Sequence, residues 1–274
     1  MPEMPEVETI ARRLRKTIIG KRISEVLLSG LPLRRPILPA FDMKLRNRTI
    51  RKVHRRGKYL IIELDPHAFW LIHLGMSGRL FYGLAGGEAA KHTHAAFRFG
   101  DTTELQYRDH RRFGLLAAYE VSRLAQIPEL RGLGIDPLSS SFSAEWLWSL
   151  LRESRQEIKS FLLDQRKIAG LGNIYACETL FLARINPERR CFALRKDEAG
   201  RLVLAIRRIL REAIRHRGTS FSDFIDLEGT PGSHQDFLHV FQREGEMCSR
   251  CNAARIERLR QGNRSSFFCP RCQT

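Results

Sequence analysis

The chain has 274 residues, of which 43% are hydrophobic, so it is long enough for two folded domains and is not disordered in composition. Its 47 Lys and Arg residues outnumber 30 Asp and Glu residues, and the resulting net charge of +17 indicates a polyanionic partner. Nucleic acid is favoured over an anionic membrane, because no apolar run approaches the ~20 residues of a membrane span and no targeting segment is evident. We therefore expect a cytoplasmic, nucleoid-associated protein.

The first residues, Met1-Pro2-Glu3-Met4-Pro5-Glu6, place a potential amine nucleophile beside an acid. If Met1 is removed, Pro2 becomes an N-terminal secondary amine that can attack an electrophilic sugar carbon and form an iminium. An α-amine titrates near pH ~8, so a useful fraction is neutral at physiological pH. The alternative is that Met-Pro is only a protease-resistant start, and these six residues alone favour that alternative.

The N-terminal half of the chain combines one helical pattern with several short strands. Apolar side chains in residues 5–18 recur at the spacing of one buried helix face. Six short β-like runs follow, at residues 59–64, 70–74, 79–82, 94–99, 104–108 and 115–119. Closely spaced strands with glycine turns are typical of a sandwich or barrel.

After about residue 130 the pattern becomes helical. Helices are expected at residues 144–152, 156–163, 173–182 and 196–216. The last has one apolar face and one arginine-rich face, which is either solvated or directed at an anionic partner. Residues 218–236 have the composition of a long flexible loop. We place the domain boundary within 125–140, and a cleft between two domains is a natural site for a bound duplex.

Four of the six cysteines form two Cys-x2-Cys pairs near the C-terminus, at Cys248, Cys251, Cys269 and Cys272. Two such pairs separated by 17 residues predict a tetrahedral zinc site closed across a β-hairpin. Four cysteine ligands leave no open coordination position, so the zinc is expected to be structural. The hairpin carries several arginines suited to phosphate or groove contacts.

Two further motifs suit DNA binding. In Ile168-Ala-Gly-Leu-Gly-Asn173, the glycines allow a tight turn, and the following helix start either offers backbone N–H groups to a phosphate or is an ordinary corner capped by Asn173. In Asp109-His-Arg-Arg-Phe-Gly114, an arginine and an aromatic at a turn could wedge into a duplex and fill the space of an extruded base. The alternative for Phe113 is a core residue flanked by surface charge.

Taken together, these motifs resemble the formamidopyrimidine-DNA glycosylase family of base-excision repair enzymes. The resemblance rests on Pro-Glu-x-Pro-Glu-Val-Glu-Thr at the N-terminus, His-Leu-Gly-Met-Ser-Gly at residues 73–78, Arg-Arg-Phe-Gly at 111–114, Gly-x-Gly-Asn-Ile-Tyr at 170–175 and the four-cysteine finger. All five occur in the family's order. The resemblance implies an α+β fold with an N-terminal β-sandwich domain and leading helix (1–130), a helix-two-turn-helix domain with a lesion-recognition loop (131–237) and a zinc finger (238–274).

The resemblance also implies roles for individual residues. The Pro2 amine would attack C1′ of the damaged nucleotide while Glu3 manages protonation around the sugar, and β,δ-elimination would follow. Lys58 and Arg264 would act with them near the lesion. The implied DNA contacts are His73, His92, Met76, Arg111, Phe113, Lys159 and Asn173. Of these, Met76, Arg111 and Phe113 would fill the void, and Arg111 could read the orphaned base.

By the same resemblance, the substrate is double-stranded DNA with oxidised purines such as 8-oxoguanine, or with abasic sites, and the enzyme is a monomer with one structural Zn²⁺. His110 departs from the family pattern, because it stands where the family usually has proline. Two alternatives stay open: an endonuclease VIII type enzyme acting on oxidised pyrimidines, and a non-catalytic zinc-finger DNA-binding protein. The second leaves the Pro2-Glu3 pair unexplained.

Overall fold

The computed structural model describes residues 1–86, 90–221 and 224–274, which form two compact units. The N-terminal unit comprises Met1–Arg131 and His216–Gln235, and the C-terminal unit comprises Gly132–Arg215 and Asp236–Thr274. The segment expected as one helical domain at 131–237 is thus divided between the units. Within the described ranges, none of the helices has the length and hydropathy that crossing a bilayer requires.

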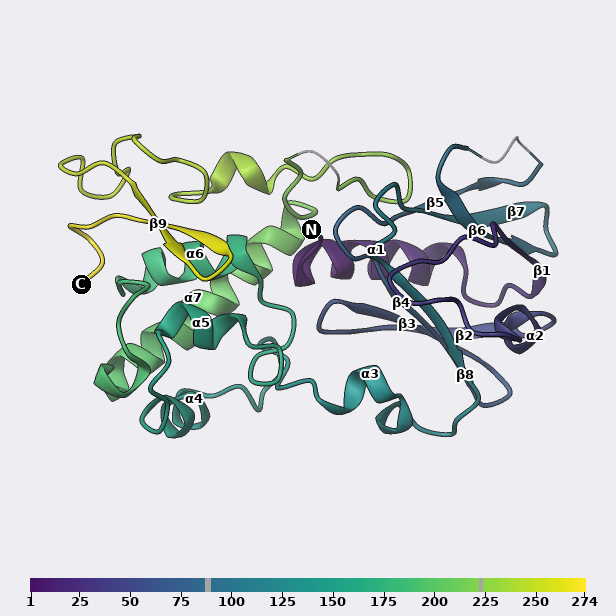
Figure 1. Ribbon diagram of the computed structural model, residues 1–274, viewed down its shortest axis with the longest axis horizontal. Helices are drawn as coiled ribbons and strands as arrows, with labels where there is room; N and C mark the ends of the chain where they lie inside the picture. Colours follow the sequence, from purple (N-terminus) through teal and green to yellow (C-terminus); the bar gives the residue numbers. More distant parts are fainter. Residues whose placement is uncertain (87–89, 222–223) are drawn as a thin grey trace. The chain divides into compact units, whose positions relative to one another are not determined.

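The N-terminal unit is a β-sandwich with a leading helix, α1 (Met4–Thr17) (Figure 1). One antiparallel sheet has the order β2-β3-β4-β8 and the other the order β1-β6-β7-β5. The strands are β1 (Ile23–Leu28), β2 (Thr49–Arg56), β3 (Tyr59–Asp65), β4 (Ala68–His73), β5 (Arg79–Leu84), β6 (Thr93–Phe99), β7 (Thr103–Arg108) and β8 (Leu115–Tyr119). The short helices are α2 (Phe41–Leu45), η1 (Leu124–Gln126) and α3 (Pro128–Arg131). All six predicted strands are present, with ends shifted by at most two residues.

A single core joins both sheets to α1 and to the segment at residues 216–235. The apolar stripe of α1, including Ile10 and Leu14, packs with Trp70 of one sheet and Phe97 of the other. Phe224 and Leu227 belong to the same core, which explains why this distant segment folds with the N-terminal unit. Burying these side chains is the main stabilising contribution, at about 1.5–3 kcal/mol for each large apolar group. The expected long loop at 218–236 is therefore anchored, although residues 222–223 lie outside the described residues.

The C-terminal unit contains four helices and a zinc-finger hairpin, and one of the helices packs against the hairpin. The helices are α4 (Ala144–Leu151), α5 (Ile158–Leu163), α6 (Asn173–Ala183) and α7 (Lys196–Arg215), with short 3₁₀ turns η2 (Cys191–Ala193) and η3 (His234–Phe237, shared with the N-terminal unit), and the hairpin is β9 (Glu257–Gln261) with β10 (Arg264–Phe268). The helix α6 is buried on nearly all sides, because it contacts α5, α7 and β10. The four expected helices are all present, and α5 begins two residues later than expected.

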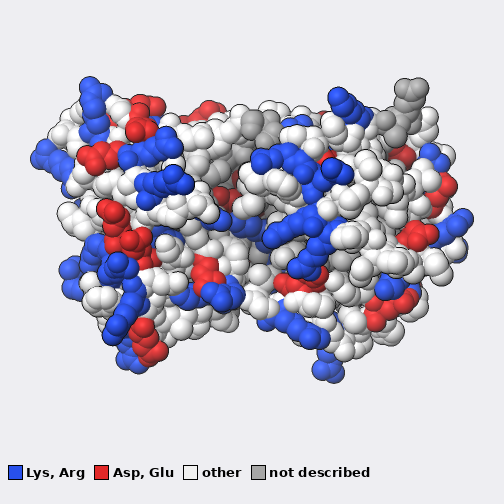
Figure 2. Space-filling view, in the orientation of Figure 1, with Lys and Arg blue, Asp and Glu red and all other residues white. Residues whose placement is uncertain are grey.

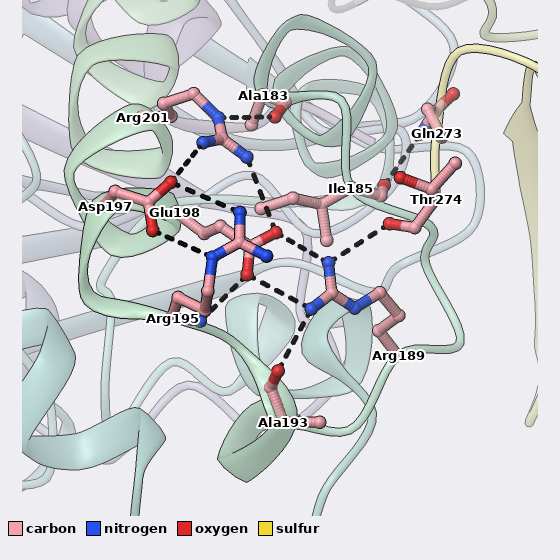
Figure 3. Close-up of polar contacts among 10 residues, drawn as sticks. All are labelled: Ala183, Ile185, Arg189, Ala193, Arg195, Asp197, Glu198, Arg201, Gln273 and Thr274. Atoms are coloured by element: carbon pink, nitrogen blue, oxygen red, sulfur yellow. Dashed lines mark hydrogen bonds and ion pairs between the residues drawn. The ribbon is translucent and has the colours of Figure 1, made fainter.

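An ion-pair cluster fixes the end of the finger to the segment between α6 and α7 (Figure 3). The guanidinium of Arg189 donates to both carboxylate oxygens of Glu198 at 2.6 and 3.1 Å and to the Thr274 carbonyl at 3.1 Å. Gln273 Nε2 donates to the Ile185 carbonyl at 2.9 Å. Burial alone would raise the pKa of Glu198, but hydrogen bonds and charge from Arg189 and Arg195 lower it overall. Arg201 of α7 joins the cluster through Asp197, so part of the arginine-rich face is structural.

Candidate nucleic-acid interface and zinc centre

The Pro2-Glu3 pair lies at the start of α1 and is buried. Glu3 is the N-cap, and Glu6 completes a capping box in which the Glu3 N–H donates to Glu6 Oε2 at 2.7 Å. Pro5 lies in the first helical turn, where its missing N–H costs nothing. Pro2 is thereby held one residue before the cap, next to Glu3.

Glu6 also holds the base of the 216–235 segment, a role that the sequence did not predict. Its Oε1 accepts the backbone N–H of Thr219 at 2.8 Å. A Cβ on Gly218 would lie 2.7 Å from the same oxygen, and the positive φ of Gly218, +85°, further favours glycine. One carboxylate therefore ties the α1 N-terminus to this segment. The only sequence signal for this contact is the glycine at 218.

Lys58 and His73 come from adjacent hairpins of the β2-β3-β4-β8 sheet. Lys58 is the second residue of a two-residue β2–β3 turn whose first residue, Gly57, has φ +57°. Tyr59 pairs directly with His73, and their rings are 4.8 Å apart. Burial, with the positive charges of Lys58 and Arg34, lowers the pKa of His73 to about 4.

The hydrogen bonding of His73 fixes which ring nitrogen is available to a ligand. Its Nδ1 accepts the Gly75 N–H at 3.0 Å. The neutral ring must therefore carry its proton on Nε2, which can donate to an anion. A neutral imidazole next to a lysine can bind a phosphate oxygen without changing its own charge near pH 7.

The structure brings together Met76, Arg111 and Phe113 from two turns. Met76 lies between β4 and β5, while Arg111 and Phe113 lie between β7 and β8. The turns meet backbone to backbone, because a Cβ on Gly75 would lie 2.4 Å from the Phe113 carbonyl carbon. Met76 is 39% and Phe113 43% exposed, so the alternative of a core phenylalanine is wrong. The Arg111 guanidinium lies 4.7 Å from the Phe113 ring centroid.

Asp109, which the sequence offered only as part of a motif, organises both turns from inside. It is 1% exposed. Its carboxylate accepts from Ser77 Oγ at 2.5 Å, from the Gly114 N–H at 2.8 Å and from Tyr107 Oη at 3.2 Å. Ser77 belongs to the Met76 turn and Gly114 to the Phe113 turn, so Asp109 couples the two. No signal in a single sequence distinguishes such a carboxylate from a solvated one.

In the C-terminal unit, Asn173 and Arg264 line one open hollow of about 510 Å³. Asn173 is the first residue of α6, whose N-cap is Gly172 without a side-chain cap, so the alternative of Asn173 as N-cap is wrong. Its Nδ2 donates instead to the Ser265 carbonyl at 3.0 Å, which leaves a second N–H for a ligand. The Arg264 guanidinium makes no hydrogen bond or ion pair with any residue that the structure describes. With the α6 N-terminus, this hollow suits an anion.

Lys159 differs from the expectation of a phosphate contact. It is 1% exposed, and its ammonium donates to the Ser265 carbonyl at 2.8 Å and to Ser266 Oγ at 2.6 Å. Both acceptors belong to β10, directly after Arg264. The buried lysine therefore fixes the strand that carries Arg264. His92 belongs to the N-terminal unit, where it lies in the turn before β6 and is exposed.

The four cysteines of the finger fit one zinc ion. Their sulfur atoms all lie within 4.8 Å of one another, with Cys248 and Cys272 3.9 Å apart and Cys251 and Cys269 3.8 Å apart. A tetrahedral ion with Zn–S bonds of about 2.3 Å requires sulfur atoms about 3.8 Å apart. The donor set and spacing therefore match a closed, structural Zn²⁺ site, which fixes the β9–β10 hairpin and with it Arg264.

Basic side chains are present on the visible face of both units (Figure 2). Three family models match the chain: "Formamidopyrimidine-DNA glycosylase N-terminal domain" at residues 1–116, "Formamidopyrimidine-DNA glycosylase H2TH domain" at 133–224 and "Zinc finger found in FPG and IleRS" at 245–274. The chain belongs to the formamidopyrimidine-DNA glycosylase family. It shares the family's α+β fold and its single structural zinc.

Relatives and solved structures match this chain over its whole length. It is 44% identical to the formamidopyrimidine-DNA glycosylase of Pelotomaculum thermopropionicum over 275 residues, covering 100% of this chain and 99% of the relative. The enzyme of Gluconobacter oxydans is 41% identical with full coverage of both. Among solved structures, Lactococcus lactis Fpg bound to abasic-site DNA has a TM-score of 0.90 at 33% identity, covering 99% of each chain. MutM bound to DNA with carbocyclic 8-oxo-G has a TM-score of 0.90 at 34% identity, covering 100% of each chain.

Proposed function

We propose that this protein is a DNA glycosylase and abasic-site lyase that removes oxidised purines, such as 8-oxoguanine and formamidopyrimidines, from duplex DNA. The observation that carries the proposal is the Pro2-Glu3 pair at the start of α1 in a chain that matches this family throughout. The substrate class is supported by the solved relatives, which are bound to DNA with an abasic site, Fapy-dG or 8-oxo-G.

In the proposed reaction, the Pro2 nitrogen forms a bond to C1′ as the bond from C1′ to the base breaks, and the base leaves with a proton. Because Pro2 is a secondary amine, ring opening of the sugar gives a positively charged iminium. That charge acidifies the C2′ proton, and its removal expels the 3′-phosphate; a second elimination expels the 5′-phosphate. Glu3 is placed beside Pro2 to manage proton transfer at the sugar ring.

The remaining residues hold the DNA in this proposal. Lys58 and the Nε2–H of His73 bind phosphate near the reacting nucleotide in the N-terminal unit, and Asn173 and Arg264 bind phosphate in the hollow of the C-terminal unit. Met76, Arg111 and Phe113 fill the space left by the extruded base, at a cost in unstacking that their apolar contacts offset. Buried Lys159 holds β10, the strand that carries Arg264. We further infer that the enzyme acts as a monomer in the cytoplasm, at the nucleoid.

The decisive experiment is borohydride trapping with protein shown by mass spectrometry to begin at Pro2. Duplexes carrying 8-oxoguanine opposite cytosine, thymine glycol or an abasic site are compared. We expect covalent adducts with 8-oxoguanine and abasic DNA, and no adduct from protein that retains Met1, because its Pro2 nitrogen is then an amide. Absence of any adduct would support the non-catalytic alternative, and preference for thymine glycol would support the endonuclease VIII type.

A further inference from the structure

Gln165 lies between α5 and α6 and is half-buried. Both ends of its side-chain amide are bonded to the backbone. Nε2 donates to the Leu163 carbonyl at 3.0 Å and to the Leu171 carbonyl at 2.7 Å. Oε1 accepts the Gly170 N–H at 2.8 Å. One side chain therefore links the last residue of α5 to the two residues before the N-cap of α6.

The three backbone groups that Gln165 bonds lie where the helices do not supply partners. Leu163 ends α5, and a carbonyl at a helix end has no partner in the helix. Gly170 and Leu171 precede α6 and are buried, and Gly170 has φ +102°, a conformation suited to glycine. A buried N–H or carbonyl without a hydrogen bond is costly. The Gln165 amide therefore stabilises this conformation of the connection.

The first part of the connection is also held by backbone pairing. Residues 134–135 pair in parallel with residues 165–169 through three hydrogen bonds of 2.8, 2.9 and 3.0 Å. A Cβ on Gly134 would lie 2.1 Å from the Lys167 carbonyl oxygen, so glycine permits this close approach. The pairing ends at Ala169, and Gln165 extends the link to Gly170 and Leu171.

The bond to Leu171 orients the peptide that leads into α6. In a trans peptide the carbonyl and the N–H point in opposite directions, so fixing the Leu171 carbonyl also fixes the plane that it shares with the Gly172 N–H. Gly172 is the N-cap of α6 and Asn173 is its first residue. Asn173 lines the hollow that also contains Arg264. Gln165 therefore controls how the start of α6 is presented to this hollow.

We propose that Gln165 is a positioning residue for binding of the DNA backbone, which acts through Leu171 and Asn173 without touching the DNA. The inference rests on the proposed function, because it takes DNA as the ligand of the hollow. Gln165 is not among the described residues that line the hollow. Binding groups that are ordered before association lose less entropy on binding, so loss of the Gln165 bonds weakens the affinity.

The test replaces Gln165 with methionine, an unbranched side chain of similar length that has no amide. DNA affinity is measured by fluorescence anisotropy with a duplex that carries an uncleavable abasic-site analogue. We expect the affinity of Gln165→Met to fall about 10-fold. Gln165→Asn keeps the amide on a shorter side chain that cannot reach all its partners, so its loss should be smaller. Circular dichroism confirms that each variant is folded, and hydrogen exchange should show lost protection of the Gly170 N–H.

A double-mutant cycle with Asn173→Ala distinguishes positioning from a general loss of stability. If Gln165 acts through Asn173, the double variant should lose much less affinity than the product of the two single losses. The matched control is Gln126→Met. Gln126 Oε1 accepts the N–H groups of Ser122 and Arg123 in the N-terminal unit, so the same substitution breaks comparable bonds elsewhere. This control should keep the wild-type DNA affinity.

Unchanged affinity of either folded Gln165 variant, or losses that multiply in the cycle, would overturn the proposal. The binding measurement does not depend on the lyase reaction. Wild-type affinity that requires Gln165, together with no borohydride adduct on any lesion, would mean that the proposed function fails while the role of Gln165 stands. Adducts on 8-oxoguanine and abasic DNA, with an affinity that does not depend on Gln165, would mean the reverse.

Discussion

Arg264 and Lys159 are both basic side chains of the C-terminal unit that the family resemblance assigns to DNA, yet their surroundings are opposite. The Arg264 side chain is exposed beside an open hollow and has no hydrogen-bond or ion-pair partner among the described residues. Lys159 is buried, with its ammonium bonded to β10. Charge type alone therefore does not determine function, because burial and available acceptors decide whether a cation faces a ligand or the protein.

Replacing Arg264 with alanine should weaken DNA binding and reduce the slope of log K against log salt by about one, as expected for one lost phosphate contact. Arg260→Ala is the control, because Arg260 lies in the same hairpin but donates to the Gly262 carbonyl and is not part of the hollow. Binding titrations at several salt concentrations give both slopes. An unchanged slope for Arg264→Ala would show that Arg264 does not touch the DNA backbone.

The lowered pKa of His73 predicts that the protein loses folding stability in acid. Its pKa is about 4 in the folded protein, below the ordinary 6.5, so the unfolded chain binds the proton more readily. Stability from the neutral ring is complete above pH 6.5 and falls as the pH is lowered from 6.5 toward 4, by on the order of 2–3 kcal/mol. In urea unfolding between pH 7 and 4.5, His73→Gln should show a shallower pH dependence than wild type. Parallel curves would contradict this.

At the scale of elements, the β4–β5 and β7–β8 turns work as one unit because they share a buried carboxylate. Asp109 bonds to both turns, and Gly75 lets their backbones touch. The exposed Met76, Arg111 and Phe113 therefore have a fixed spacing before any DNA arrives. A wedge that is already ordered loses less conformational entropy on insertion than a mobile loop would.

Asp109→Asn should loosen this arrangement, because an amide cannot accept from all the donors that face the carboxylate. We expect a loss of about 1–3 kcal/mol in stability. Excision of 8-oxoguanine should fall more than trapping on preformed abasic DNA, since only the first requires a base to be extruded. The two activities of the same preparation are compared, with Asp101→Asn as an exposed control. Equal losses of both activities would argue against a role in extrusion.

At the scale of the whole molecule, each unit carries its own share of the proposed DNA contacts and its own source of order. The N-terminal unit relies on a large apolar core, which also takes in Phe224 and Leu227 from far along the chain. The finger has a small core around Cys248, Ile256 and Phe267. It relies on metal and on polar links, in which Gln273 donates to the Ile185 carbonyl and the Thr274 carbonyl accepts from Arg189 (Figure 3). Small folds of this kind need such cross-links.

Removal of zinc should therefore destabilise the finger and leave the N-terminal β-sandwich folded. After chelation, amide hydrogen exchange should show lost protection in β9 and β10 and retained protection in β3 and β4, and DNA affinity should fall because Arg264 is no longer held. Adding Zn²⁺ back to the wild-type protein should restore both, whereas Cys272→Ser should not respond. Retained protection of the hairpin without metal would mean that the polar links alone suffice.

Most helices and strands could be predicted from local sequence patterns, and the strands that were not predicted have local causes. The six predicted strands alternate or are continuously apolar, whereas β1 was missed because this edge strand buries only Ile23 fully and pairs on one side with β6. The strand β2 was not predicted, because its basic sequence has only two apolar residues, Ile50 and Val53, and an irregularity in the strand pairing leaves them three residues apart rather than two. Strand propensity depends on neighbours that a single sequence does not show.

The sequence by itself determined the family motifs, the four zinc ligands and the nucleophile candidate at Pro2, because each depends on residue type and spacing along the chain. Only the tertiary structure decided that Lys159 is internal, that Asp109 joins two turns and that Glu6 holds Thr219 across 213 positions. It also placed His92 near His110. The physical reason is that desolvation and hydrogen-bond partners come from residues distant in sequence, and these decide what a polar side chain can do.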